Sequence, residues 1–140
     1  MQRKGSAIWK GGLKDGNGQA STGSGGLQAA PYTFASRFES GGKTDPEELI
    51  AAAHAACFSM AFSGQLGQAN LKPESIATTA TVTLEKTDAG MTITAVHLAV
   101  KARVPGADRA AFDKAANNAK TGCPISRLLN AKITLEAVLE

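Results

Sequence analysis

The chain has 140 residues, of which 43% are hydrophobic and 19% charged, and its net charge is +3. This length is typical of one domain with its own core, so we expect a single domain over residues 1–140. The lysines and arginines are scattered, which argues against a nucleic-acid surface. No segment reaches about 18 uninterrupted apolar residues, and no apolar run follows the basic start, so neither a membrane span nor a signal peptide is predicted. We therefore expect a cytoplasmic protein, in which two cysteines are more often catalytic or redox-active than a permanent disulfide.

The first third of the chain predicts three strands. Residues 6–13 and 18–25 flank the sequence DGNG at 15–18, which is a strong signal for a hairpin turn. Residues 32–38, YTFASRF, alternate as a third strand would. The stretch SGGKT at 40–44 is then expected to be the loop into the next element.

A long helix follows, from Pro46 to about Gly67, with a length of about 33 Å. Asp45 is suited to cap its first N–H groups, Pro46 to occupy its first position, and Glu48 to complete a capping box. A helix that is apolar on every side is a buried helix, and one sheet of so small a chain cannot cover all sides. We therefore expect a second subunit to cover part of it. The apolar residues of this helix are Leu49, Ile50, Ala52, Ala53, Ala56, Phe58, Met60 and Phe62.

The second half of the chain predicts a hairpin, two helices and a last strand. Residues 76–87 and 91–104 alternate with a period of two around a short turn. Residues 108–120 have the pattern of a helix, residues 124–130 of a short helix, and residues 131–140 of a closing strand. The order β-β-β-α-β-β-α-α-β is an α+β fold with a long buried central helix.

Two cysteines are the candidate chemical groups. Cys57 lies in the middle of the long helix, where it is either a small buried hydrophobic residue or a reactive thiol. Cys123 precedes a helix, and the positive end of a helix dipole lowers a thiol pKa, so the local setting alone favours Cys123 over Cys57 as the nucleophile. The alternative for Cys123, equally open, is an N-cap with no reactivity. His54, three residues before Cys57, is either a thiol activator or a helix residue that finds a hydrogen bond. There is no C-x-x-C, and structural zinc needs four ligands, so no metal is expected.

Arg37 and Glu47 are two further charged candidates. Arg37 lies between Ser36 and Phe38 at the end of the predicted third strand, and Glu47 lies in the first turn of the long helix. Their simplest interpretations are a surface ion pair for Arg37 and a complement to the helix dipole for Glu47.

Three segments carry a resemblance to a known family. They are PYTFASRFE at 31–39, TDPEELIAAAHAACFSMAFS at 44–63 and KTGCPISRLL at 120–129. They resemble the OsmC branch of the OsmC/organic hydroperoxide resistance family, and the similarity extends over nearly the whole chain. The motifs P-E-x-L-x(7)-C-F and G-C-P are specific in combination.

The resemblance implies a thiol-dependent peroxidase that reduces organic hydroperoxides in oxidative or osmotic stress defence. It implies that Cys57 attacks the peroxide, that Cys123 resolves the product as a disulfide, and that Arg37 and Glu47 form a charged pair beside the thiol. It further implies an intertwined homodimer, no cofactor, and a dithiol reductant for which a lipoylated protein is one candidate. Arg37 matches only the OsmC branch, because the other branch takes its arginine from a different strand.

The helix geometry adds one expectation of its own. Glu47 and Cys57 are ten residues apart, or about 15 Å along one helix, so Glu47 cannot serve the Cys57 of its own chain. It can serve the partner's Cys57 if two copies of the helix cross antiparallel near Ala52. We therefore expect a two-fold axis near Ala52.

Two other classes of protein stay open. One is a non-catalytic α+β binding module for RNA or a small apolar ligand, although strand aromatics for base stacking are few. The other is a structural dimer with two inert cysteines, whose thiols would react slowly with alkylating agents at neutral pH.

Overall fold

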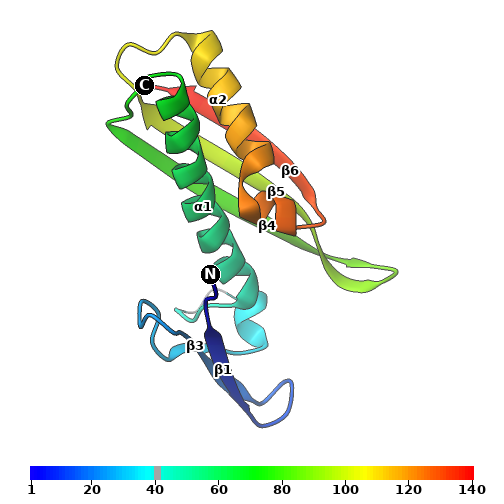
Figure 1. Cartoon of the computed structure of the whole chain (residues 1–140). Coiled ribbons are helices and arrows are strands. Elements are labelled where there is room, and N and C mark those ends of the chain that lie inside the picture. The colour runs from blue at the N-terminus through cyan, green and yellow to red at the C-terminus, as the bar shows by residue number, and fades with distance from the viewer. Residues whose placement is uncertain (40–41) are drawn as a thin grey trace. The chain divides into compact units, whose positions relative to one another are not determined.

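The computed structural model describes residues 1–39 and 42–140, so Ser40 and Gly41 of the predicted loop lie outside the described residues. The chain divides into two compact units, Met1–Leu49 and Ile50–Glu140. Six strands and three helices follow one another in the predicted order, apart from a short 3-10 helix after the third strand (Figure 1). The strands form two three-stranded sheets. The α+β fold class is confirmed.

The first unit contains an antiparallel sheet of β1 (Gly5–Lys10), β2 (Asn17–Thr22) and β3 (Ala30–Tyr32). The predicted hairpin is confirmed, with Lys10 paired to Asn17 at its closed end. The rings of Trp9 and Tyr32 pack with their centroids 5.4 Å apart, and so connect the outer strands across β2.

The prediction of a strand over 32–38 is wrong beyond Tyr32. Residues Ala35–Arg37 form a 3-10 helix, η1. Thr33 and Ser36 exchange hydrogen bonds, each backbone N–H donating to the other residue's hydroxyl at 3.1 Å. Such local bonds from Ser and Thr side chains compete with strand pairing, and here they outweigh the alternating pattern.

Helix α1 (Pro46–Gln68) begins where the sequence predicts. The Asp45 carboxylate accepts a hydrogen bond from the Glu48 backbone N–H at 2.8 Å, which confirms the N-cap. The Glu48 carboxylate accepts from the Thr44 hydroxyl at 2.7 Å, so its partner is the residue before the cap. By length and composition α1 could also cross a membrane, a test that the core helix of a soluble protein passes as well.

The second unit combines the rest of α1 with a sheet of β4 (Ser75–Thr87), β5 (Gly90–Arg103) and β6 (Lys132–Leu139). Strands β4 and β5 pair antiparallel, whereas β5 and β6 pair in parallel. Parallel neighbours need a long crossover, and α2 (Arg109–Gly122) and α3 (Pro124–Leu128) supply it.

The core of this unit lies between the sheet and the two long helices, which cover one of its faces (Figure 1). Phe62 of α1 meets Phe112 of α2 edge to face, with ring centroids 5.2 Å apart. Only one side of α1 takes part, and its buried residues are His54, Phe58, Phe62 and Leu66. The opposite side, which we call the open face of α1, is exposed in the single chain and consists of Ala53, Ala56, Met60, Gly64 and Gly67.

Candidate active site

The two cysteines come together although 66 residues separate them in the chain. Their sulfur atoms are 2.9 Å apart, both thiols are free, and the two thiols share a hydrogen bond. Cys123 is fully buried, whereas Cys57 is partly exposed. A dissolved reagent therefore reaches Cys57 before it reaches Cys123.

The corner between α2 and α3 fixes Cys123. Its backbone N–H donates to the Ala119 carbonyl at 2.9 Å, so it ends α2, and Pro124 begins α3 directly after it. The predicted position at a helix N-terminus is confirmed. The thiol does not cap α3, and it faces Cys57 instead.

The surroundings of Cys57 favour the neutral thiol. Burial raises the pKa of Cys57, and the hydrogen bond shared with the Cys123 thiol raises it further, while the backbone N–H of Ile125 acts in the opposite direction. The α3 amide thus favours the charged form of Cys57, although Cys123 is the cysteine that precedes the helix. A thiolate at Cys57 needs a further positive group.

His54 binds α3 rather than the thiol. Its Nε2 lies 2.8 Å from the Ser126 hydroxyl, and burial lowers its pKa, so the ring is neutral at physiological pH. Among the described residues its Nδ1 has no hydrogen-bond partner. The interpretation of His54 as a helix residue that finds a hydrogen bond is therefore confirmed. Sequence reasoning missed Ser126, whose one available signal was its place three residues after Cys123.

Arg37 and Glu47 form an ion pair within the first unit. The Arg37 Nε lies 3.1 Å from the Glu47 carboxylate, and the two side chains are 32% and 17% exposed. The turn η1 supplies the arginine and the first turn of α1 supplies the glutamate. The Ser36 hydroxyl, 2.8 Å from the Thr44 carbonyl, connects these two segments.

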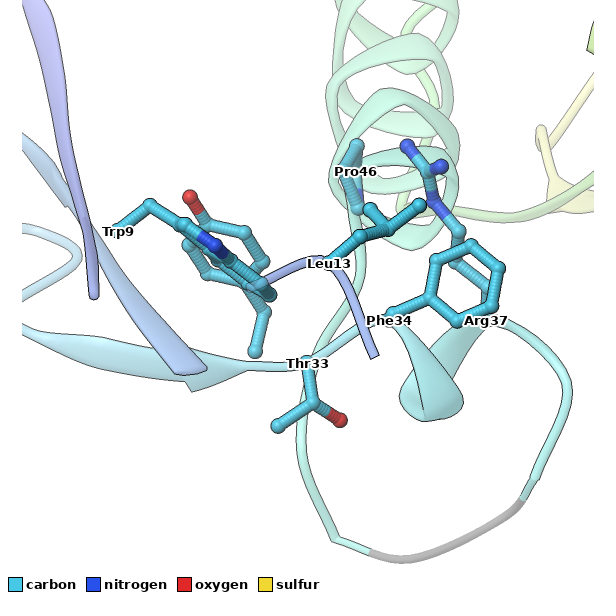
Figure 2. A pocket seen from close by; sticks show the side chains of 7 residues that line it. Trp9, Leu13, Thr33, Phe34, Arg37 and Pro46 are labelled. Carbon is cyan, nitrogen blue, oxygen red and sulfur yellow. The ribbon is translucent and has the colours of Figure 1, made fainter. Parts of the chain in front are cut away.

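A cavity of about 280 Å³ adjoins Arg37 in the same unit. Figure 2 shows Arg37 and Phe34 on one side of it, near Pro46, and Trp9 on the other. Sequence reasoning did not single out this group, although the single Trp and the single Tyr of the chain both belong to it. The lining residues are Trp9, Leu13, Tyr32, Thr33, Phe34, Arg37 and Pro46.

Within residues 1–39 and 42–140, no three His, Cys, Asp or Glu side chains gather as metal ligands would. The second unit therefore offers two adjacent thiols and a buried imidazole, and the first unit offers an arginine–carboxylate pair and an apolar cavity.

Solved structures with this architecture define the class of protein. The organic hydroperoxide resistance protein OhrB of Bacillus subtilis matches with a TM-score of 0.71 and 24% identity, over 98% of each chain. An organic hydroperoxide resistance protein OsmC from Legionella pneumophila matches with a TM-score of 0.70 and 25% identity, over 96% of each chain. The chain has the fold of these proteins.

The sequence comparisons are more specific. Residues 39–138 match the family model of OsmC-like proteins. Peroxiredoxin OsmC of Escherichia coli (strain K12) is 51% identical over 140 residues, which cover 100% of this chain and 98% of that protein. The chain belongs to the OsmC family, as the resemblance predicts.

Proposed function

We propose that this protein is a peroxiredoxin that reduces organic hydroperoxides to alcohols, with Cys57 as the attacking thiol and Cys123 as the resolving thiol. The observation that carries the proposal is the 2.9 Å separation of the two sulfur atoms. It occurs in a chain that is 51% identical to a protein named as a peroxiredoxin.

The reaction balances with the groups at the site. The Cys57 thiolate attacks the terminal oxygen of the hydroperoxide, the O–O bond breaks, and the alkoxide leaves and takes up a proton as the alcohol. Cys57 is then a sulfenic acid. The Cys123 thiol condenses with it, and water leaves as the disulfide forms. A dithiol returns the pair to two thiols by exchange and is itself oxidised to a disulfide.

Burial supports the division of roles between the cysteines. Cys57 is partly exposed, so a hydroperoxide can reach its sulfur, whereas Cys123 is 0% exposed and contacts the Cys57 sulfur directly. The Ile125 N–H favours the charged form of Cys57. These observations favour Cys57 as the nucleophile, against the local argument that favours Cys123.

The positive group that Cys57 needs is Arg37 of the partner subunit in this proposal. Glu47, which holds Arg37 at 3.1 Å, is ten residues from Cys57 on α1, or about 15 Å by the helix rise. A pair from a second subunit can approach Cys57 if two α1 helices cross antiparallel near Ala52. An arginine close to the thiol then lowers its pKa, and the glutamate orients the guanidinium.

The open face of α1 supports an intertwined homodimer. It is made of small residues and Met60, which is 72% exposed in the single chain. A side chain added at Gly64 or Gly67 would meet open space, so the face is free to receive a second helix closely. We infer that residues 1–140 form one domain of such a dimer.

The cavity of about 280 Å³ beside Arg37 is the proposed site for the organic group of the hydroperoxide. Its aromatic and aliphatic lining favours an apolar substituent over hydrogen peroxide, which has none to bury. The reductant is proposed to be a dithiol, with a lipoyl group as one candidate, and the compartment to be the cytoplasm.

Peroxide consumption tests the proposal directly. Purified protein is mixed with cumene hydroperoxide or hydrogen peroxide, with dihydrolipoamide or dithiothreitol as the reductant. We expect faster turnover of the organic peroxide, loss of turnover in Cys57→Ser, and a single stoichiometric oxidation in Cys123→Ser. Loss of that first oxidation in Cys123→Ser would reverse the two roles. No turnover with any dithiol would favour a protein that only binds small apolar ligands.

A further inference from the structure

A partly buried hydrogen bond joins α1, which carries Cys57, to α3, which follows Cys123 directly. The His54 Nε2 lies 2.8 Å from the Ser126 hydroxyl, and His54 is 0% exposed. His54 precedes Cys57 by three residues on α1, and Ser126 follows Cys123 by three residues on α3. The bond therefore lies one turn from each thiol.

The imidazole of His54 is the donor in this bond, and it keeps that role near neutral pH. Buried N–H groups without an acceptor are rare, and the Nδ1 of His54 has no partner among the described residues, so the proton belongs on Nε2. Burial lowers the His54 pKa, so the ring does not acquire a charge near neutral pH.

Helix α3 has little else to hold it in place. It is five residues long, and an isolated helix of this length is not stable in water. None of its own residues is buried, and the core holds it only at its ends, through the buried Cys123 before it and Leu129 after it. Yet Cys123 precedes it directly, and its Ile125 N–H acts on the Cys57 sulfur.

We propose that His54 and Ser126 are positioning residues, which hold α3 against α1 and thereby set the rate at which Cys123 captures oxidised Cys57. Neither residue touches the reacting atoms in this proposal. The inference rests on the proposed function, because the oxidised form is the sulfenic acid that a hydroperoxide produces.

The step affected is the condensation of the two cysteines. The bond between the two sulfur atoms forms, the S–O bond of the Cys57 sulfenic acid breaks, and the hydroxyl leaves with the Cys123 proton as water. When capture is slow, a second hydroperoxide oxidises the sulfenic acid to a sulfinic acid, which the dithiol does not reduce. Positioning of α3 therefore decides between the reversible and the irreversible product.

The test uses Ser126→Ala in the full-length protein, with Ser126→Thr as the variant that keeps the hydroxyl. Thr134→Val is the matched control, because it also removes a hydroxyl that is hydrogen-bonded to a histidine. The Thr134 hydroxyl of β6 lies 2.7 Å from the His97 Nδ1 of β5. Reduced protein receives cumene hydroperoxide, and mass spectrometry follows the disulfide and the sulfinic acid with time. We expect Ser126→Ala to form the disulfide about tenfold more slowly and to accumulate more sulfinic acid. Ser126→Thr and Thr134→Val should behave as the wild type does.

A second measurement needs no peroxide. The equilibrium between the Cys57–Cys123 disulfide and glutathione reports the effective concentration of the two thiols, which we expect to fall about fivefold to tenfold in Ser126→Ala. If Ser126→Ala does not fold, His54→Leu replaces it, because leucine has no group that can bond to the Ser126 hydroxyl. Unchanged disulfide kinetics and an unchanged glutathione equilibrium would overturn the inference. A wild-type Cys57 that hydroperoxide does not oxidise would instead overturn the proposed function, and the glutathione equilibrium would still decide the role of Ser126.

Discussion

Burial distinguishes the two cysteines more strongly than their local sequence does. Cys123 precedes a helix, but its thiol is enclosed and points at Cys57. The first amides of that short helix are available to a neighbour, and the Ile125 N–H acts on Cys57. From the sequence alone, the helix dipole of α3 is expected to act on Cys123. In the fold, the first amides of α3 act on Cys57 instead.

His54 gives the stability of the protein a pH dependence of known sign. Burial lowers its pKa from the ordinary value of 6.5, so the folded chain binds this proton less readily than the unfolded chain. Its contribution is complete above pH 6.5 and is lost as the pH falls toward the lowered pKa. We expect the free energy of unfolding, measured with urea, to fall below pH 6.5 in the wild type and less steeply in His54→Gln. Equal slopes for the two proteins would contradict this.

Elements with a clear period could be predicted from the sequence, and those shaped by local polar bonds could not. The long helix and the hairpin of β4 and β5 have strong patterns, and their bounds are close to those predicted. The segment after Tyr32 also alternates, but the bonds between Thr33 and Ser36 form a turn there. An alternating pattern indicates which side chains suit a strand, but it gives no information about side chain-to-backbone hydrogen bonds that favour a turn instead.

The site could be predicted only in part, for a similar reason. Local settings in the sequence indicated Cys57, Cys123, Arg37 and Glu47 as candidates, and the resemblance to the OsmC family assigned their roles. The bond between His54 and Ser126 joins two helices that are far apart in the chain, and no local pattern indicates it. The lining of the cavity is likewise a property of the assembled β1–β3 unit.

The cavity in the first unit makes a prediction about substrate selectivity. Leu13 lines it and is 66% exposed, so Leu13→Ser should leave stability nearly unchanged. A smaller apolar lining weakens the binding of an organic group, and we expect kcat/KM for cumene hydroperoxide to fall roughly fivefold to tenfold. The rate with hydrogen peroxide should be unchanged. An equal fall with both peroxides would show that the cavity does not hold the organic group.

At the scale of the whole molecule, one chain leaves two requirements unmet. The open face of α1 is apolar and exposed in the single chain, and such faces mark interaction sites. Cys57 has a raised pKa, while its proposed reaction needs the thiolate. An antiparallel pair of α1 helices would meet both requirements. It would cover the open face, and it would bring the Arg37–Glu47 pair of the second subunit close to Cys57.

Two variants separate these effects. Ala53→Arg places a charged side chain on the open face of α1, so the dimer should dissociate, and Arg37→Gln removes the guanidinium while the open face is unchanged. An opposite charge within a few Å lowers a thiol pKa by about 1–3, so both variants should slow the alkylation of Cys57 by iodoacetamide near neutral pH by about tenfold or more. Sedimentation should show a monomer for Ala53→Arg and a dimer for Arg37→Gln. If monomeric Ala53→Arg is alkylated as fast as the wild type, the arginine that activates Cys57 does not come from the partner subunit.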